Sequence, residues 1–211
     1  MSIVNTIERI RVWAETEICS KVELKLPDDK QAAEGYPYKL VTPAAFAMFT
    51  PTSDKLPPNI RAPVPSVCVR LVELTDTAGP TGGGRSRQYK IVLAFSTWDP
   101  GPHGMDTFVQ AEPGTFVHLD KDTAKAFQKA DMGWRDAWNF VDVAMRALET
   151  TPDIGGLHIV EGDGIKCGPA VAQDGVFDFY PYWYAWIEFF AEEPVLRKAP
   201  TTSADPMDNF L

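Results

Sequence analysis

The chain has 211 residues, of which 45% are hydrophobic and 23% are charged, and its formal net charge is -9. This composition is typical of a single globular domain, and the excess of acidic residues opposes a broad surface for binding nucleic acid phosphates. Its apolar runs are shorter than the roughly 20 residues that cross a bilayer, and the N-terminus lacks a secretory signal pattern. Three widely spaced cysteines without a C-x-x-C pair favour reduced thiols in a cytosolic protein. We therefore expect no membrane contact, no disulfide framework and no cysteine zinc site.

The N-terminal segment has a helical pattern. Ile3, Ile7, Ile10 and Ala14 recur at helical spacing within residues 3–17. This spacing predicts an amphipathic helix that packs one face on a sheet. The sequence KVELKL that follows is a short strand candidate.

Residues 27–65 are rich in proline, which excludes regular helix over most of the segment. The segment also contains Tyr36, Tyr38, Phe46 and other apolar residues, too many for a solvated linker. Two interpretations remain open. The segment is either a long loop packed on its own domain or an extended arm that lies on a neighbouring subunit.

Residues 66–74 and 88–98 are two β-rich runs joined by a turn-rich sequence, which predicts a hairpin with a long loop. The glycines in that loop match neither a P-loop nor a dinucleotide-binding fingerprint. A hairpin tip is therefore favoured over a phosphate-binding loop.

The strongest helical pattern lies in the second half of the chain. A shorter helix is predicted to begin near Asp120. The longer helix that follows has a predicted core stripe of Trp134, Trp138, Val141, Met145 and Leu148.

The last part of the chain predicts strands. LHIVE and IKCGPAV, separated by a glycine-containing turn, predict a hairpin, and residues 182–190 predict a final strand. Both faces of that strand are apolar, so something must cover each of them. One face carries Trp183, Ala185, Ile187 and Phe189, and the other carries Tyr184, Trp186, Glu188 and Phe190. The pattern does not decide which set faces inward.

These elements predict an α+β fold with a twisted, mainly antiparallel sheet of about four to six strands and two or three helices packed on one face. Residues 1–193 form the single predicted domain, with the Pro-rich extended insertion at 27–65. Residues 194–211 are polar and spaced by prolines, so we expect a flexible C-terminal tail unless a partner orders it.

One segment resembles a metal site. Asp99, His103 and Asp106 lie close together, with His118 and Asp120 following, and carboxylates and imidazoles are metal ligands. Their spacing matches no known metal loop, however, and the prolines and glycines between them are typical of a rigid turn. A metal-dependent hydrolase using Asp99, His103 and Asp106 is therefore an alternative only.

The remaining candidates for chemistry are weak. Cys167 lies in a strand pattern and is predicted to be a small core residue, and His158 is predicted to be a structural or surface residue. We predict no catalytic residue, no metal, no cofactor and no enzymatic activity.

Four segments resemble, in the same order, the tail-terminator group of small tail proteins encoded by bacteriophages and prophages of Gram-positive bacteria. They are VCVRLVEL, KIVLAFSTWDPGPHG, GWRDAWNFVDVAMRALE and IKCGPAVAQDGVFDFYPYWYAWIEFF. The shared features are an aspartate-containing turn after a hairpin, a G-x-x-D helix start at Gly133 and Asp136, and the Pro181, Tyr182, Trp183 sequence that opens the final strand.

The resemblance implies a compact α+β subunit of the virion tail or neck, assembled in the host bacterial cytoplasm. It implies a homo-oligomeric ring, expected to hold six copies, that stops growth of the tail tube and then contacts the head-tail connector. DNA would pass without sequence-specific binding. The insertion at 27–65 is absent from the smallest members of the group, so another tail or neck protein, such as a tail-completion or tube component, is the alternative function.

The aromatic strand gives the predicted oligomer interface. A ring buries an apolar patch through a heterologous contact, in which one surface meets a different surface on the next copy. A strand enclosed by the Pro-rich segment of its own chain is the competing interpretation, and a host-binding module is a third hypothesis. The predicted interface residues are Trp98, Asp99, Tyr182, Trp183, Tyr184, Trp186 and Phe190.

Overall fold

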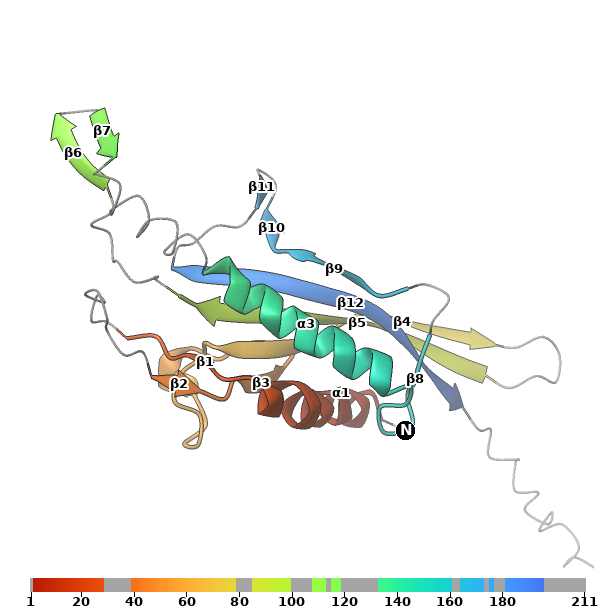
Figure 1. Cartoon of the computed structure of the whole chain (residues 1–211). Helices are drawn as coiled ribbons and strands as arrows, with labels where there is room; N and C mark the ends of the chain where they lie inside the picture. The colour runs from red at the N-terminus through yellow and green to blue at the C-terminus, as the bar shows by residue number, and fades with distance from the viewer. Residues whose placement is uncertain are drawn as a thin grey trace, which may run out of the picture.

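The structure is a computed structural model of the whole chain. It describes residues 2–28, 39–78, 85–99, 108–112, 115–118, 133–160, 164–172, 175–176 and 181–195. Helices and a curled, mostly antiparallel sheet make up these residues (Figure 1). The prediction of a mixed α and β fold with a mainly antiparallel sheet is confirmed.

Within the described residues the main sheet has six strands, in the order β3-β4-β5-β12-β8, with β9 also beside β12. β3 runs parallel to β4, and the other neighbours are antiparallel. The strands are β3 (Ala44–Ala47), β4 (Ser66–Ala78), β5 (Arg85–Trp98), β8 (His158–Ile159), β9 (Lys166–Pro169) and β12 (Tyr182–Val195).

The hairpin predicted from the two β-rich runs is β4 and β5, both longer than their sequence patterns. β12 pairs with β5 along its whole length, from Tyr182 opposite Trp98 to Val195 opposite Arg85. The strand continues through Pro194 and Val195, two residues past the end of the domain predicted at residue 193.

β8 and β9 do not form the predicted hairpin with each other. Both pair with β12, β9 opposite Ala185 to Glu188 and β8 opposite Ala191 and Glu192. The hairpin prediction was wrong because the edge of β12 is long enough to pair with two short strands in succession. Turn residues between β8 and β9 do not indicate pairing with a strand that follows later in the chain.

The N-terminal helix is α1 (Ile3–Trp13), followed by a π-helical turn, η1 (Ala14–Ile18), and a 3₁₀ turn, η2 (Cys19–Lys21). Ile10 and Ala14 are buried as predicted, but Ile3 is exposed. Thr6 and Trp13 complete the buried side of the helix instead. The predicted apolar side of the helix was therefore wrong in its first turn, where Thr6 rather than Ile3 is buried.

The second long helix is α3 (Trp134–Thr150). Its predicted stripe was wrong for the tryptophans, because Trp134 and Trp138 are 44% and 37% exposed. The buried side is instead centred near Phe140 and Ala144, so the tryptophans lie toward its margin and are partly exposed. The buried side of α3 consists of Ala137, Phe140, Val141, Ala144, Ala147 and Leu148.

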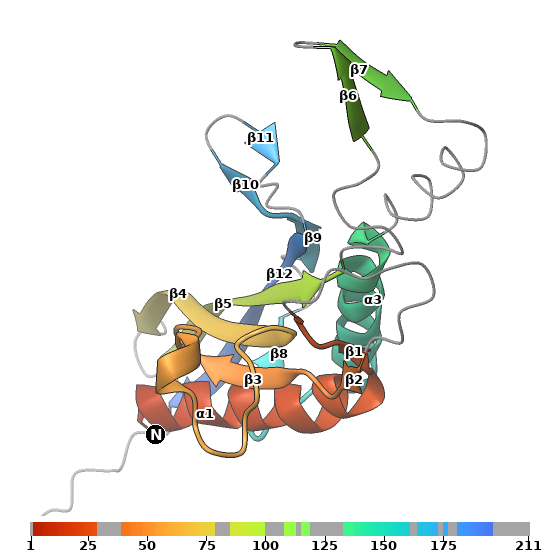
Figure 2. The same ribbon diagram turned by 90° about the vertical axis from the view of Figure 1, so that its left-hand side faces the viewer.

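One core holds the sheet and the helices together. α1 contacts β3 and β4, whereas α3 contacts β5 and β12 (Figures 1 and 2). Phe140 of α3 packs edge-on against Phe95 of β5, with ring centroids 4.9 Å apart. The strand residues in this core are Ala45, Val67, Val69, Tyr89, Ile91, Leu93, Phe95, Ile159, Ala185, Ile187, Phe189 and Ala191.

The described part of the Pro-rich segment has no α-helix, as predicted. It contributes β2 (Leu40–Val41), which pairs with β1 (Leu24–Lys25), then β3 and a 3₁₀ turn, η3 (Ser53–Lys55). Phe46 is buried, whereas Phe49 is exposed. Tyr36 and Tyr38 lie outside the described residues, as does the helix predicted near Asp120.

Two small hairpins complete the described elements. β6 (Phe108–Glu112) pairs with β7 (Thr115–His118), and β10 (Val171–Ala172) pairs with β11 (Gly175–Val176). Among the described residues, no helix is both long and apolar enough to cross a membrane.

Candidate functional site

The two sides of β12 differ in what they face. Ala185, Ile187 and Phe189 are fully or almost fully buried and belong to the core, and Trp183 packs against it. We call this side the inner face. The opposite side, the outer face, carries four half-buried aromatic residues, which we call the aromatic strip: Tyr182, Tyr184, Trp186 and Phe190.

Trp186 is the best fixed member of the aromatic strip. Its Nε1 donates a hydrogen bond of 2.8 Å to the carbonyl of Pro169 on β9. Gly168 lies opposite Trp186, and a Cβ atom on Gly168 would meet the indole ring at 3.1 Å. The ring therefore lies over the glycine, and this holds a large flat surface on the outer face.

Charged groups frame the far end of the aromatic strip. Lys90 of β5 lies 3.1 Å from the carboxylate of Glu188 and 5.8 Å from the centre of the Phe190 ring. Burial raises the pKa of Tyr184, and the neighbouring Tyr182 adds to that rise. An apolar centre with a charged border is the usual anatomy of a protein interface.

The other predicted interface residues lie at one end of the sheet, inside the chain. Trp98 and Asp99 are buried, and the indole Nε1 of Trp183 donates to the carbonyl of Asp99 at 3.1 Å. The Asp99 N–H donates to Pro181 at 2.9 Å. The predicted interface set thus divides into four outer-face residues and three residues that pack within the chain.

Gly133 is required at this end of the sheet by close approach. A Cβ atom there would lie 2.4 Å from Trp183 Nε1 and 2.8 Å from the Asp99 carbonyl oxygen. Asp99, which follows β5, therefore lies next to Gly133, which precedes α3. We call Lys25, Asp99, Gly133, Asp136 and Trp183 the sheet-end cluster.

Lys25 forms ion pairs with both carboxylates of the sheet-end cluster. Its Nζ lies 2.6 Å from Asp99 Oδ2 and 3.4 Å from Asp136 Oδ2. Burial nevertheless raises the pKa of Asp136, and repulsion from Asp99 adds to this while Lys25 opposes it. No sequence pattern pointed to Lys25, because its partners lie far along the chain.

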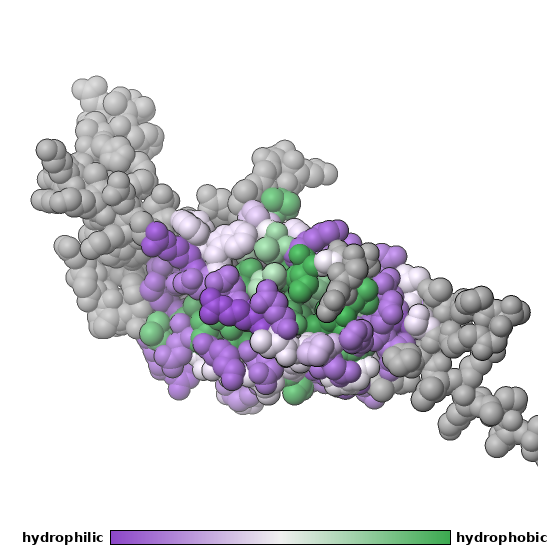
Figure 3. Space-filling model, turned by 45° about the vertical axis from the view of Figure 1, so that its right-hand side comes forward, coloured by the Kyte–Doolittle hydropathy of each residue, from purple (hydrophilic) through white to green (hydrophobic). Residues whose placement is uncertain are grey.

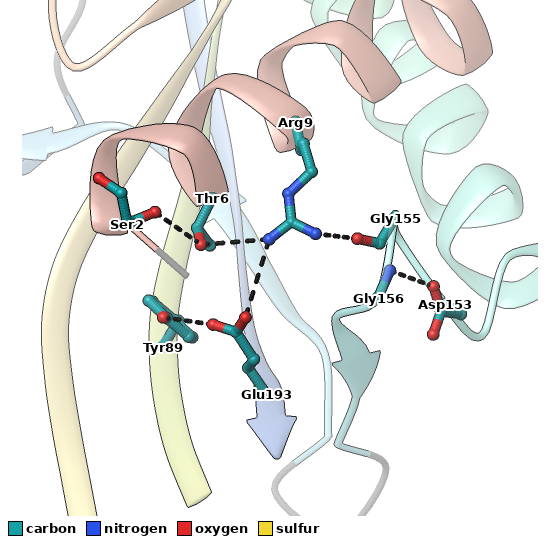
Figure 4. Close-up of polar contacts among 8 residues, drawn as sticks. All are labelled: Ser2, Thr6, Arg9, Tyr89, Asp153, Gly155, Gly156 and Glu193. Atoms are coloured by element: carbon teal, nitrogen blue, oxygen red, sulfur yellow. Dashed lines mark hydrogen bonds and ion pairs between the residues drawn. The ribbon is translucent and has the colours of Figure 1, made fainter. Parts of the chain in front are cut away.

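A second polar network lies at the opposite end of the sheet (Figure 4). The hydroxyl of Tyr89 donates to Glu193 Oε2 at 2.9 Å in the buried interior, and Arg9 Nη2 lies 4.0 Å from Glu193 Oε1. Arg9 also donates to the carbonyl of Gly155 and to Thr6 Oγ1. The network ties α1, β5, β12 and the turn after α3 together, so its role is structural.

The turn after α3 depends on glycine. Gly155 and Gly156 have φ angles of +60° and +90°, a region that residues with a Cβ atom seldom adopt. The Gly156 N–H donates to Asp153 Oδ1 at 2.6 Å. The turn thereby presents the Gly155 carbonyl to Arg9.

The candidate metal ligands cannot be assembled from the described residues. Asp99 is engaged in the sheet-end cluster, His103, Asp106 and Asp120 lie outside the described residues, and the side chain of His118 is not described. Within the described part of the chain, no three His, Cys, Asp or Glu side chains gather as a metal site would require.

The cysteines offer no site either. Cys167 is exposed, so the prediction that it belongs to the core was wrong. It lies on β9, a short strand that pairs with β12 at the edge of the sheet. His158 is exposed, as one of the two predicted alternatives had it. Burial raises the pKa of Cys19 to about 12, which leaves that thiol protonated and unreactive.

Apolar surface is not restricted to the outer face of the sheet. Trp134 and Trp138 lie one helical turn apart on a flank of α3, and the guanidinium of Arg135 lies 5.7 Å from the Trp134 ring. Figure 3 shows hydrophobic residues in the middle of the face that it presents, with hydrophilic residues around them. Partly exposed aromatic side chains therefore lie on two different elements, the strand β12 and the helix α3.

Comparison with known proteins adds no relative: no family model matches the chain, and no curated protein matches its sequence.

Proposed function

We propose that the chain is a structural subunit of the phage tail-terminator type, which assembles head to tail with copies of itself into a ring and carries out no chemical step. One observation carries this proposal. The aromatic strip on the outer face and the exposed tryptophans of α3 are two different apolar surfaces of the same subunit.

A head-to-tail contact needs two different surfaces that complement each other, and closure of the ring then leaves neither exposed. In the proposed arrangement both helices cover the inner face of the sheet, and α3 lies on the side away from the aromatic strip. The two surfaces then point in opposite directions, so that each subunit can contact a neighbour on either side. Aromatic side chains are enriched in such interfaces, and tryptophan and tyrosine supply much of their binding energy.

The sheet-end cluster supports the proposed relationship to tail terminators. The resemblance rested on three separate stretches of sequence, around Asp99, Gly133 and Trp183. In the structure these residues contact one another. If the chain shares its architecture with tail terminators, we expect the matching stretches of those proteins to contact one another in the same way.

The Pro-rich segment extends the proposal. Met48 and Phe49 are exposed at the end of β3, so this segment also has apolar area that a neighbouring subunit can cover. β2 and β3 pair within their own subunit, so we infer that only the exposed Met48 and Phe49 contact the next copy and add to the ring contact. A tail-completion or tube component would use the same two surfaces. Assembly into long tubes, rather than closure into single rings, would distinguish a tube component from a terminator.

Two charge-introducing variants test the head-to-tail contact. Tyr184→Glu blocks the aromatic strip, and Trp138→Glu blocks the helix surface. The wild-type chain should form rings in negative-stain images and have a mass several times 23.4 kDa, whereas each variant alone should remain a monomer. Val4→Glu, which changes an exposed valine of α1 outside both surfaces, is the matched control and should assemble normally.

Mixing the two variants gives the decisive result. Each has one intact surface, so an equimolar mixture should form a dimer and stop there. A mixture that stays monomeric, or variants that still form rings, would exclude these two surfaces as partners.

A further inference from the structure

A shallow groove of about 730 Å³ runs between α1 and the turn after α3. Trp13 and Ile154 form its buried floor, and Val12, which is 44% exposed, lies along it. Glu8 and Glu17 of α1 stand at its rim and are exposed. The groove therefore has an apolar floor, with Arg9 and two carboxylates at its rim, of which Glu8 is paired with Arg11 at 2.6 Å. Neither of the surfaces proposed for ring assembly includes it.

Near its end, β12 contacts a residue that lines this groove, because Glu193 lies beside Arg9 (Figure 4). Glu193, two residues before the strand ends, lies 4.0 Å from Arg9, and Arg9 donates to the carbonyl of Gly155. Arg9 and Gly155 both line the groove. The chain that continues from Val195 therefore starts next to it.

We propose that the segment beginning at residue 196 docks in this groove of its own subunit as an extended chain. The segment starts with Leu196, Arg197 and Lys198, an apolar residue followed by two cations. Leu196 suits the apolar floor, and the two cations suit Glu8 and Glu17 at its rim. The groove follows α1 for about 18 Å, at 1.5 Å per residue, which about six residues of extended chain cover.

Thiol labelling measures occupation of the groove. Val12→Cys is introduced together with Cys167→Ser, so that the new thiol in the groove becomes the reactive one, because Cys19 and Cys68 are buried. Its labelling rate is compared between the full chain and a chain that ends at Val195. We expect labelling to be about tenfold slower in the full chain, which corresponds to docking worth about 1.4 kcal/mol.

Two controls make the comparison specific. Val72→Cys, at an exposed position on β4, should label at the same rate in both chain lengths. A synthetic peptide of residues 196–211 added to the shortened chain should restore slow labelling at position 12, and the same peptide with Arg197→Glu and Lys198→Glu should not.

The outcomes separate this inference from ring assembly. Protection that persists on dilution and in the monomeric Tyr184→Glu background supports docking within one subunit. Protection that disappears on dilution would show that a second copy covers the groove, which overturns the proposal. Equal labelling of the full and shortened chains would overturn it as well.

Discussion

The inner and outer faces of β12 are built from the same kinds of residue but serve different purposes. The inner face packs Ile187 and Phe189 against a core that belongs to its own chain. The outer face holds Trp186 and Phe190 half-buried and bordered by charges. Hydrophobicity alone therefore does not say whether a residue stabilises the fold or offers a contact. The distinction lies in what covers each face.

α3 shows the same distinction with the sizes reversed. Its buried side contains three alanines, whereas its largest residues, Trp134 and Trp138, are turned outward. Phe140 and Leu148 are buried on that same side, so position around the helix, rather than size, decides which residues are buried. Large exposed aromatics are therefore better candidates for contacts between subunits than for the core.

The largest expected effect comes from comparing Phe189→Ala with Phe190→Ala. Phe189 is fully buried, so its truncation should lower the free energy of unfolding by about 3–5 kcal/mol, through lost burial and an unfilled cavity. Phe190→Ala should cost about 1 kcal/mol or less, because its side chain already meets solvent. Urea denaturation in the Tyr184→Glu background, where assembly should be blocked, measures both. Equal losses would show that the two faces are equally enclosed.

Glycine positions on the two faces give a smaller contrast. Gly133→Ala places a methyl group against both Trp183 and a backbone oxygen, and we expect a loss of about 1–3 kcal/mol. Gly168→Ala meets only the Trp186 ring, at 3.1 Å, and that ring can shift on the outer face. Thermal denaturation should rank Gly133→Ala as the less stable variant, and the reverse order would contradict the tight packing of the sheet end.

The smallest effect concerns pH. Because burial raises the pKa of Asp136 above 3.8, the folded chain binds this proton more tightly than the unfolded chain does. The stability of the wild type relative to Asp136→Asn should therefore fall as pH rises from below 3.8 through the raised pKa. At neutral pH the variant should be at least as stable as the wild type. Unfolding curves measured across this range would contradict the account if Asp136→Asn became the weaker protein as pH rose, since Lys25 would then outweigh burial.

Local patterns in the sequence predicted much of the fold. The β4–β5 hairpin, the final strand, and the existence of α1 and α3 all follow from periodicity and turn residues. The order of β8 and β9 along β12 did not, because pairing with a distant edge leaves no local signal. The stripe predicted on α3 was right for Val141 and Leu148, which are buried, and wrong for Trp134 and Trp138, which were assigned to the core for their size.

The candidate site was predictable only in part. Alternation within the final strand gave the two sets of residues correctly, but choosing the inner set required knowing that Leu93 and Phe95 face the same side. Trp98, Asp99 and Trp183 were predicted to be interface residues, whereas the structure packs them together within the chain. Lys25 and Arg9 join elements distant in sequence, so only the fold brings them to their partners.

The most direct test of the central claim is the mass of the native protein across a dilution series. If the aromatic strip and the α3 tryptophans contact each other between copies, the mass at high concentration should be a fixed multiple of 23.4 kDa and should fall toward that value on dilution. A mass of one chain at every concentration would contradict assembly through these surfaces.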